Sequence, residues 1–131
     1  MKKLLCFGDG IARGYGEYLA DALSAWYDVT VKYITDSRSL LSCLKSETDK
    51  TDCSTVIFNC GLHDIKYNWM DEEIQVDMIE YGNNLRRICA VLKSMADNVF
   101  FVNSTPVYDE IHNSTANILK NGEFVRKESE K

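Results

Sequence analysis

The chain has 131 residues, of which 45% are hydrophobic and 27% are charged, and its formal net charge is −5. These values are typical of one folded globular domain over residues 1–131, which needs neither a metal nor a disulfide to fold. The acidic balance argues against a general nucleic-acid binder and against docking on an acidic membrane surface, because both need clustered Lys and Arg. We therefore expect neither nucleic acid nor membrane as a partner.

The cysteines are odd in number and show no CxxC spacing: Cys6, Cys43, Cys53, Cys60 and Cys89. This pattern predicts reduced thiols in a cytoplasmic protein. The apolar run near the start, residues 4–7, is shorter than a signal peptide requires and far shorter than a membrane span.

Apolar spacing predicts seven elements in chain order. The first strand, 4–7, precedes a helix over about 15–27, whose apolar face is Tyr15, Leu19, Ala22, Leu23 and Trp26. A strand at 28–34 and a helix at 37–46 follow, the helix capped by Asp36 or Ser37. After a polar loop at 47–52 comes the most apolar strand, 54–60, and then a loop at 61–72.

The last predicted helix carries an apolar stripe spaced by four and three residues: Ile74, Met78, Tyr81, Leu85, Ile88, Leu92 and Met95. Such a stripe forms either a coiled-coil seam or, as we favour here, a face packed on a sheet. A strand at 98–104 follows. Residues 107–131 are a polar C-terminal tail, for which we expect a short helix around 115–127.

Alternating strands and helices predict an α/β fold with a parallel sheet covered on both faces. In such sheets, ligands bind at the carboxyl ends of the strands. Three segments follow strands and should meet there: Gly8-Asp9-Gly10, Thr35-Asp36-Ser37 and Gly61-Leu62-His63-Asp64.

Three sequence blocks resemble those of the SGNH, or GDSL-type, hydrolases. The blocks are LLCFGDG with GYGEYLADAL, then VIFNCGLHDI, and then VNSTPVYDEIHN, and their order matches over essentially the whole chain. The resemblance implies a three-layer, flavodoxin-like fold and an esterase or acetylesterase activity. It also implies a nucleophilic Ser in the first block, an oxyanion hole built from three blocks, and a late Asp-x-x-His pair.

The chain departs from this pattern at its chemical positions. Gly10 stands where the family has its Ser, Thr35 aligns with the oxyanion Gly, and His63 replaces the Asn of the third block. Glycine has no oxygen to acylate, whereas a neutral imidazole N–H could still stabilise an oxyanion. The sheet of about four strands lacks the family's last strand, and no Asp-x-x-His follows such a strand. The matching cleft positions are Asp9, Gly10, Thr35, Gly61, His63 and Asp64, and we expect no catalytic residue among them.

Other residues offer chemistry that we weigh against simpler roles. His112, in Asp109-Glu110-Ile111-His112, could act as a base, but a solvated loop is favoured. Cys60 next to His63 could be a nucleophile, but its strand favours core packing. Asp9, His63 and Asp64 could hold a metal, although helix caps and turn contacts are favoured and no cofactor or metal is expected. Phosphate binding at the glycine-rich turn is disfavoured, because Asp9 would repel the anion and no Walker motif is present.

Three functional hypotheses follow. The favoured one is a degenerate SGNH-type domain without hydrolytic activity, because losing nucleophile and base together costs several orders of magnitude in rate. Such a domain would bind a protein partner or a second copy, through the cleft rim or an open sheet edge. The second is an esterase acting on a small ester or acetylated carbohydrate without a Ser nucleophile, using His63, Asp64 and His112. The third is a fragment whose Asp-x-x-His lies elsewhere.

Overall fold

The computed structural model describes residues 1–46, 53–68 and 73–104. In chain order the elements are β1 (Lys2–Gly8), α1 (Gly10–Leu23), β2 (Tyr27–Tyr33), α2 (Ser37–Ser46), β3 (Cys53–Phe58), β4 (Tyr67–Asn68), β5 (Glu73–Ile74), α3 (Met78–Met95) and β6 (Ala96–Phe101). The predicted loop at 47–52, the tail at 107–131 with its expected helix, and His112 lie outside the described residues. The assignment of one domain to the whole chain therefore stays a prediction.

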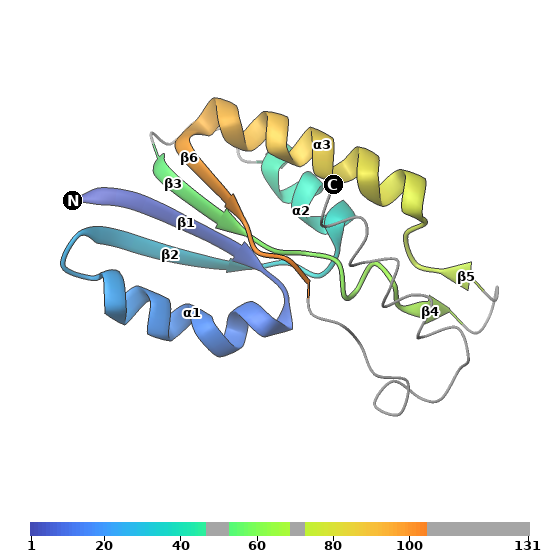
Figure 1. Ribbon diagram of the computed structural model, residues 1–131, viewed down its shortest axis with the longest axis horizontal. Coiled ribbons are helices and arrows are strands. Elements are labelled where there is room, and N and C mark those ends of the chain that lie inside the picture. Colours follow the sequence, from blue (N-terminus) through green and yellow to red (C-terminus); the bar gives the residue numbers. More distant parts are fainter. Residues whose placement is uncertain (47–52, 69–72, 105–131) are drawn as a thin grey trace.

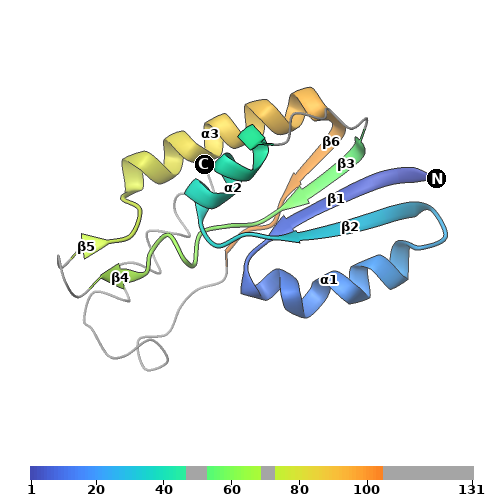
Figure 2. The same cartoon turned by 180° about the vertical axis from the view of Figure 1, so that it is seen from behind.

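The four long strands form one parallel sheet in the order β2-β1-β3-β6. Helix α1 lies on one face of this sheet, and α2 and α3 lie on the other (Figures 1 and 2). The predicted α/β fold, with about four parallel strands and helices on both faces, is confirmed. Because every strand runs the same way, all four carboxyl ends lie at one edge of the sheet.

Helix α1 begins five residues before the predicted start, at Gly10, because Asp9 caps it there. Its buried residues are Ala12 and Gly16 rather than the larger apolar side chains of the predicted face. A Cβ at Gly16 would lie 3.1 Å from Val31 Cγ1, so the helix approaches β2 closely. Trp26, predicted to be on the buried face, lies beyond the end of the helix and is 65% exposed.

The predicted loop at 61–72 contains part of a short antiparallel ribbon, in which Tyr67 pairs with Ile74. Ile74 was predicted to begin the third helix, but it belongs to β5. Asp77 caps α3 through a hydrogen bond from the Glu80 N–H at 2.9 Å, so the helix starts at Met78. The apolar spacing continues from the ribbon into the helix without a break, so it does not show where the helix begins. The carboxylate of Asp77 determines that start.

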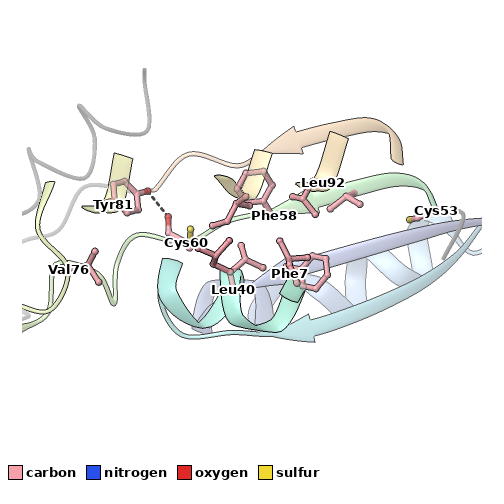
Figure 3. Packing of buried hydrophobic residues seen from close by; sticks show 12 residues of the cluster. Phe7, Leu40, Cys53, Phe58, Cys60, Val76, Tyr81 and Leu92 are labelled. Carbon is pink, nitrogen blue, oxygen red and sulfur yellow. Dashed lines mark hydrogen bonds between the residues drawn. The ribbon is translucent and has the colours of Figure 1, made fainter. Parts of the chain in front are cut away.

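The main core lies between the sheet and the α2–α3 layer (Figure 3). Phe7 from β1 and Phe58 from β3 meet Leu40 of α2 and Leu92 of α3, all of them buried. Most of the predicted stripe of α3 faces this core, with Tyr81, Ile88 and Leu92 fully buried. The alternative of a coiled-coil seam is not needed, because the sheet covers the stripe.

Strand β6 pairs with β3 along one side and ends the sheet among the described residues. On this strand Phe100 is 57% exposed, and Val102 just beyond it is 40% exposed. An apolar edge strand of this kind invites pairing with another chain. No helix among the described residues is long and apolar enough to cross a membrane.

Candidate functional site

The carboxyl ends of β1, β2, β3 and β6 are tied together by backbone hydrogen bonds that continue beyond the regular strands. Ile34 N–H donates to the Gly8 carbonyl at 2.8 Å, and Asn59 N–H donates to the Phe7 carbonyl at 3.0 Å. Val102 N–H donates to the Phe58 carbonyl at 2.9 Å. The segments after β1, β2 and β3 therefore start side by side at the carboxyl edge of the sheet. The sequence predicts this arrangement.

The turn after β1 fixes Asp9 and leaves Gly10 open. Asp9 is buried, and its Oδ1 accepts the Ile11 N–H at 3.0 Å, which caps α1. Gly10 is exposed, and a Cβ built there would meet no atom within 4 Å. No described residue accepts a hydrogen bond from the Gly10 N–H, which is one of the donors that a helix leaves free at its start.

A buried side-chain network lies directly beneath this turn. The Tyr15 hydroxyl donates to Asn59 Oδ1 at 2.7 Å, and Asn59 Nδ2 donates to Asp9 Oδ1 at 3.0 Å. Burial raises the pKa of the Tyr15 phenol, with smaller contributions from Cys6 and Asp9, so the hydroxyl stays a donor. A Cβ at Gly8 would lie 2.4 Å from Asn59 Oδ1, so Gly8 is needed for close approach rather than for a special turn.

The segment after β2 is occupied by the cap of α2. Ser39 N–H donates to Asp36 Oδ1 at 2.8 Å, and Asp36 N–H donates back to Ser39 Oγ at 3.1 Å, a reciprocal cap. Of the two predicted caps, Asp36 is therefore the one that holds its own helix. The Thr35 N–H also donates to Ser39 Oγ, at 2.9 Å. That N–H is not available for the oxyanion role that the family pattern would give to position 35.

The loop after β3 separates Asp64 from His63. Gly61 has φ 146°, a conformation that L side chains rarely adopt, which accounts for glycine at this point. Asp64 is fully buried, and its oxygens accept the Ser37 N–H at 3.0 and 3.1 Å and the Ser37 hydroxyl. His63 is exposed at the surface of the same loop. Asp64 is thus a second cap of α2, as the preference for caps over metal binding predicts.

Asp64 lies in a setting that disfavours its charge. Burial raises the pKa of its carboxyl to about 6, against the lowering effect of the Ser37 hydrogen bonds. Asn84 of α3 donates to Ser37 Oγ at 3.0 Å and extends the same network to a third element. The network therefore fixes the β3 loop to α2 and α3.

The thiols and hydroxyls around the strand ends are engaged in the framework. Cys6 and Cys60 are fully buried, and burial raises the pKa of both thiols, so neither presents a thiolate. Asp64, Asp9 and Asp36 raise the pKa of Cys60 further, which places all three carboxyls within electrostatic reach of it. The Ser104 hydroxyl donates to the Cys60 carbonyl at 3.2 Å. The expectation of Cys60 as a core residue is confirmed.

Among residues 1–46, 53–68 and 73–104, no three His, Cys, Asp or Glu side chains gather as metal ligands would. Asn59, Tyr15 and Asn84 are parts of the site that the sequence reading missed. Asn59 had a usable signal, since an amide at the end of an otherwise apolar strand must find hydrogen-bond partners when it is buried. No sequence signal distinguishes Tyr15 or Asn84, because each occupies an ordinary position in a helix.

No family model and no curated protein sequence matches the chain. Solved structures do. A catalytic mutant of an acetylxylan esterase from Geobacillus stearothermophilus is similar at TM-score 0.75 and 19% identity, covering 98% of this chain and 72% of that one. Another acetyl xylan esterase gives TM-score 0.70 at 14% identity with the same coverage, 98% and 72%. A proposed acylhydrolase from Bacteroides fragilis gives 0.67 at 15%, covering 94% and 59%.

Proposed function

We propose that this chain is an SGNH-hydrolase-like domain that binds a ligand at the carboxyl end of its sheet without cleaving it. The observation that carries the proposal is Gly10. By the resemblance of the first sequence block it corresponds to the family's serine, and it lies at the start of α1, where a side chain would have free space. The residue there supplies a backbone N–H donor but no nucleophile.

The surroundings of Gly10 support this proposal, because two thiols and two hydroxyls near the strand ends are buried or already hydrogen-bonded. The Cys6 and Cys60 thiols are buried and protonated. The Ser37 hydroxyl donates to Asp64, and the Tyr15 hydroxyl donates to Asn59. Each of these hydrogens would have to leave a buried partner before it could serve catalysis.

The ligand class follows from the donors at the site and from the similar structures. The Gly10 N–H, which has no acceptor among the described residues, and the exposed His63 offer hydrogen bonds to a carbonyl oxygen. Two of the similar structures are esterases of acetylated xylan. We therefore assign to this site the acyl group of a small ester or of an acetylated saccharide.

Binding is tested by titrating the ¹⁵N-labelled protein with acetylated xylo-oligosaccharide, with the deacetylated oligosaccharide as control. We expect the amide signals of Gly10 and its neighbours to shift with the acetylated ligand alone. Equal shifts with both ligands, or none, would contradict binding of an acyl group at this site.

Catalysis is tested with 4-nitrophenyl acetate on the wild type, Gly10→Ser and the matched control Gly10→Ala. We expect no protein-dependent turnover by the wild type or by Gly10→Ala. Turnover by the wild type that His63→Ala removes would overturn the proposal. It would favour the alternative of an esterase without a serine, for which the exposed His63 is the supporting observation. Activity that appears only in Gly10→Ser would show that the remaining machinery is intact and that the missing hydroxyl alone silences it.

A protein partner or a second copy at the edge of β6 stays a prediction. Phe100 and Val102 are the exposed apolar residues that support it. Sedimentation velocity over a range of concentrations tests self-association, which Phe100→Lys should weaken. A monomer at every concentration would contradict the second-copy form of the prediction.

A further inference from the structure

A hollow lies at the end of the sheet opposite to Gly10. It is formed where β1, β3 and β6 begin and where α3 ends, and its volume is about 570 Å³. Figure 1 shows the starts of these strands grouped at the same end as the N-terminus. Pockets for small molecules have volumes of roughly 300 to 1,000 Å³, so the hollow is large enough for one.

The charge of this hollow is opposite to that of the whole chain. Lys2, Lys3 and Lys93 line it, with Asp97 as the acidic residue of the lining. The chain as a whole carries −5. Among the described residues, none of the three lysines is in an ion pair. Asp52, directly before β3 in the sequence, lies outside the described residues.

The other polar groups of the lining are already donating their hydrogens inward. Ser54 Oγ donates to the Lys3 carbonyl at 3.1 Å, and Cys53 Sγ donates to the same carbonyl at 3.3 Å. Ser94 Oγ donates to the Val91 carbonyl at 2.6 Å. The remaining strong side-chain donors are the lysine ammonium groups, so a ligand that fits must supply negative charge and acceptor oxygens.

From these contacts we infer that the hollow binds a small soluble molecule carrying phosphate groups. Lysine binds phosphate as a point charge, and a phosphate offers acceptors without requiring donors. An anionic membrane presents the same chemistry, but the negative charge of the whole chain opposes approach to such a surface. The site is separate from the carboxyl end of the sheet and goes beyond the proposed function.

The test is calorimetric titration with pyrophosphate at two salt concentrations. We expect one saturable site whose affinity for pyrophosphate falls as the salt concentration rises, because salt screens exposed charges. Each of Lys2→Gln, Lys3→Gln and Lys93→Gln should weaken binding about fivefold, and the triple variant should abolish it. Lys66→Gln removes an exposed lysine at the far end of the sheet and is the matched control.

Two results would overturn the inference. One is binding by the triple variant equal to that of the wild type, with folding of the variant checked by circular dichroism. The other is equal weakening by Lys66→Gln, which would indicate a diffuse field rather than a site. A second arm uses vesicles of phosphatidylcholine with phosphatidic acid. Vesicle binding that soluble pyrophosphate cannot compete would assign the lysines to a membrane and contradict a soluble ligand.

Discussion

The turn after β1 and the loop after β3 are built alike but differ at their outward positions. Each has one buried carboxylate that caps a helix, Asp9 for α1 and Asp64 for α2. Each also has one exposed position beside that carboxylate: Gly10 in the turn and His63 in the loop. The two inward carboxylates hold helix starts, whereas among the described residues the side chain of His63 makes no hydrogen bond or ion pair and Gly10 has no side chain. We therefore expect stability to constrain positions 10 and 63 less than positions 9 and 64.

The largest expected effect separates two glycines of the same turn. In Gly8→Ala the new Cβ would lie 2.2 Å from Ala12 Cβ and 2.4 Å from Asn59 Oδ1, so helix or network must shift. We expect a loss of about 3 kcal/mol or more in the free energy of unfolding, measured by urea denaturation. Gly10→Ala meets no atom within 4 Å and should be neutral or stabilise by up to about 1 kcal/mol. Equal losses in both variants would remove the distinction between inward and outward positions.

A smaller effect is expected at the loop after β3. Asp64→Asn keeps the shape of the side chain but weakens the hydrogen bonds from Ser37, and should cost about 2 kcal/mol near neutral pH. The matched control is His63→Gln, at the exposed neighbouring position, which should change stability by less than about 0.5 kcal/mol. A larger loss of unfolding free energy in His63→Gln than in Asp64→Asn would contradict the distinction between the inward and outward positions.

The same variant isolates a pH dependence. The pKa of Asp64 rises from 3.8 to about 6 on folding, so the folded chain binds this proton more tightly than the unfolded chain. The part of the stability from Asp64 that depends on its proton is therefore full below about pH 4 and is lost as the pH rises to about 6, whereas the hydrogen bonds from Ser37 remain above that pH. The difference in unfolding free energy between wild type and Asp64→Asn should fall over this window and stay flat above it. A difference that rises with pH would contradict the assignment.

The smallest expected effect is in the network below the β1 turn. Tyr15→Phe removes the hydrogen bond to Asn59 Oδ1 and should cost about 1 kcal/mol in thermal or urea unfolding. Tyr18→Phe, at an exposed position of the same helix, is the control and should cost nearly nothing. If both variants behave alike, the buried network does not support the turn.

The sequence was sufficient for the order of the main elements and for the fold class, because apolar spacing reports which face of each element is buried. It did not predict the residues at which α1 and α3 begin, or how closely α1 approaches the sheet. Asp9 and Asp77 start their helices where spacing alone does not, and α1 packs through Ala12 and Gly16. Small residues give little signal in a hydrophobic pattern, although they allow the closest contact between helix and sheet.

The sequence predicted that the candidate residues follow strands of the sheet, but it did not predict the hydrogen bonds between them. The resemblance to the SGNH hydrolases located Gly10, His63 and Asp64, and the structure places all three after strands of the sheet. The partner of Asp64 is Ser37, which lies 27 positions earlier in the chain. Such a pair leaves no periodic pattern in the sequence. It becomes visible only when the strands are placed side by side.

The hydrogen bonds from Ser37, at the start of α2, to Asp64 have a consequence for the order of folding. With 10 residues, α2 is shorter than helices that persist alone in water. Its first turn gains a buried acceptor only after β3 has docked beside β1 and brought its loop into place. The helix should therefore consolidate late, although it precedes β3 in the chain. Slow hydrogen exchange at the Ser37 amide would report the docking of the central strand rather than helix formation.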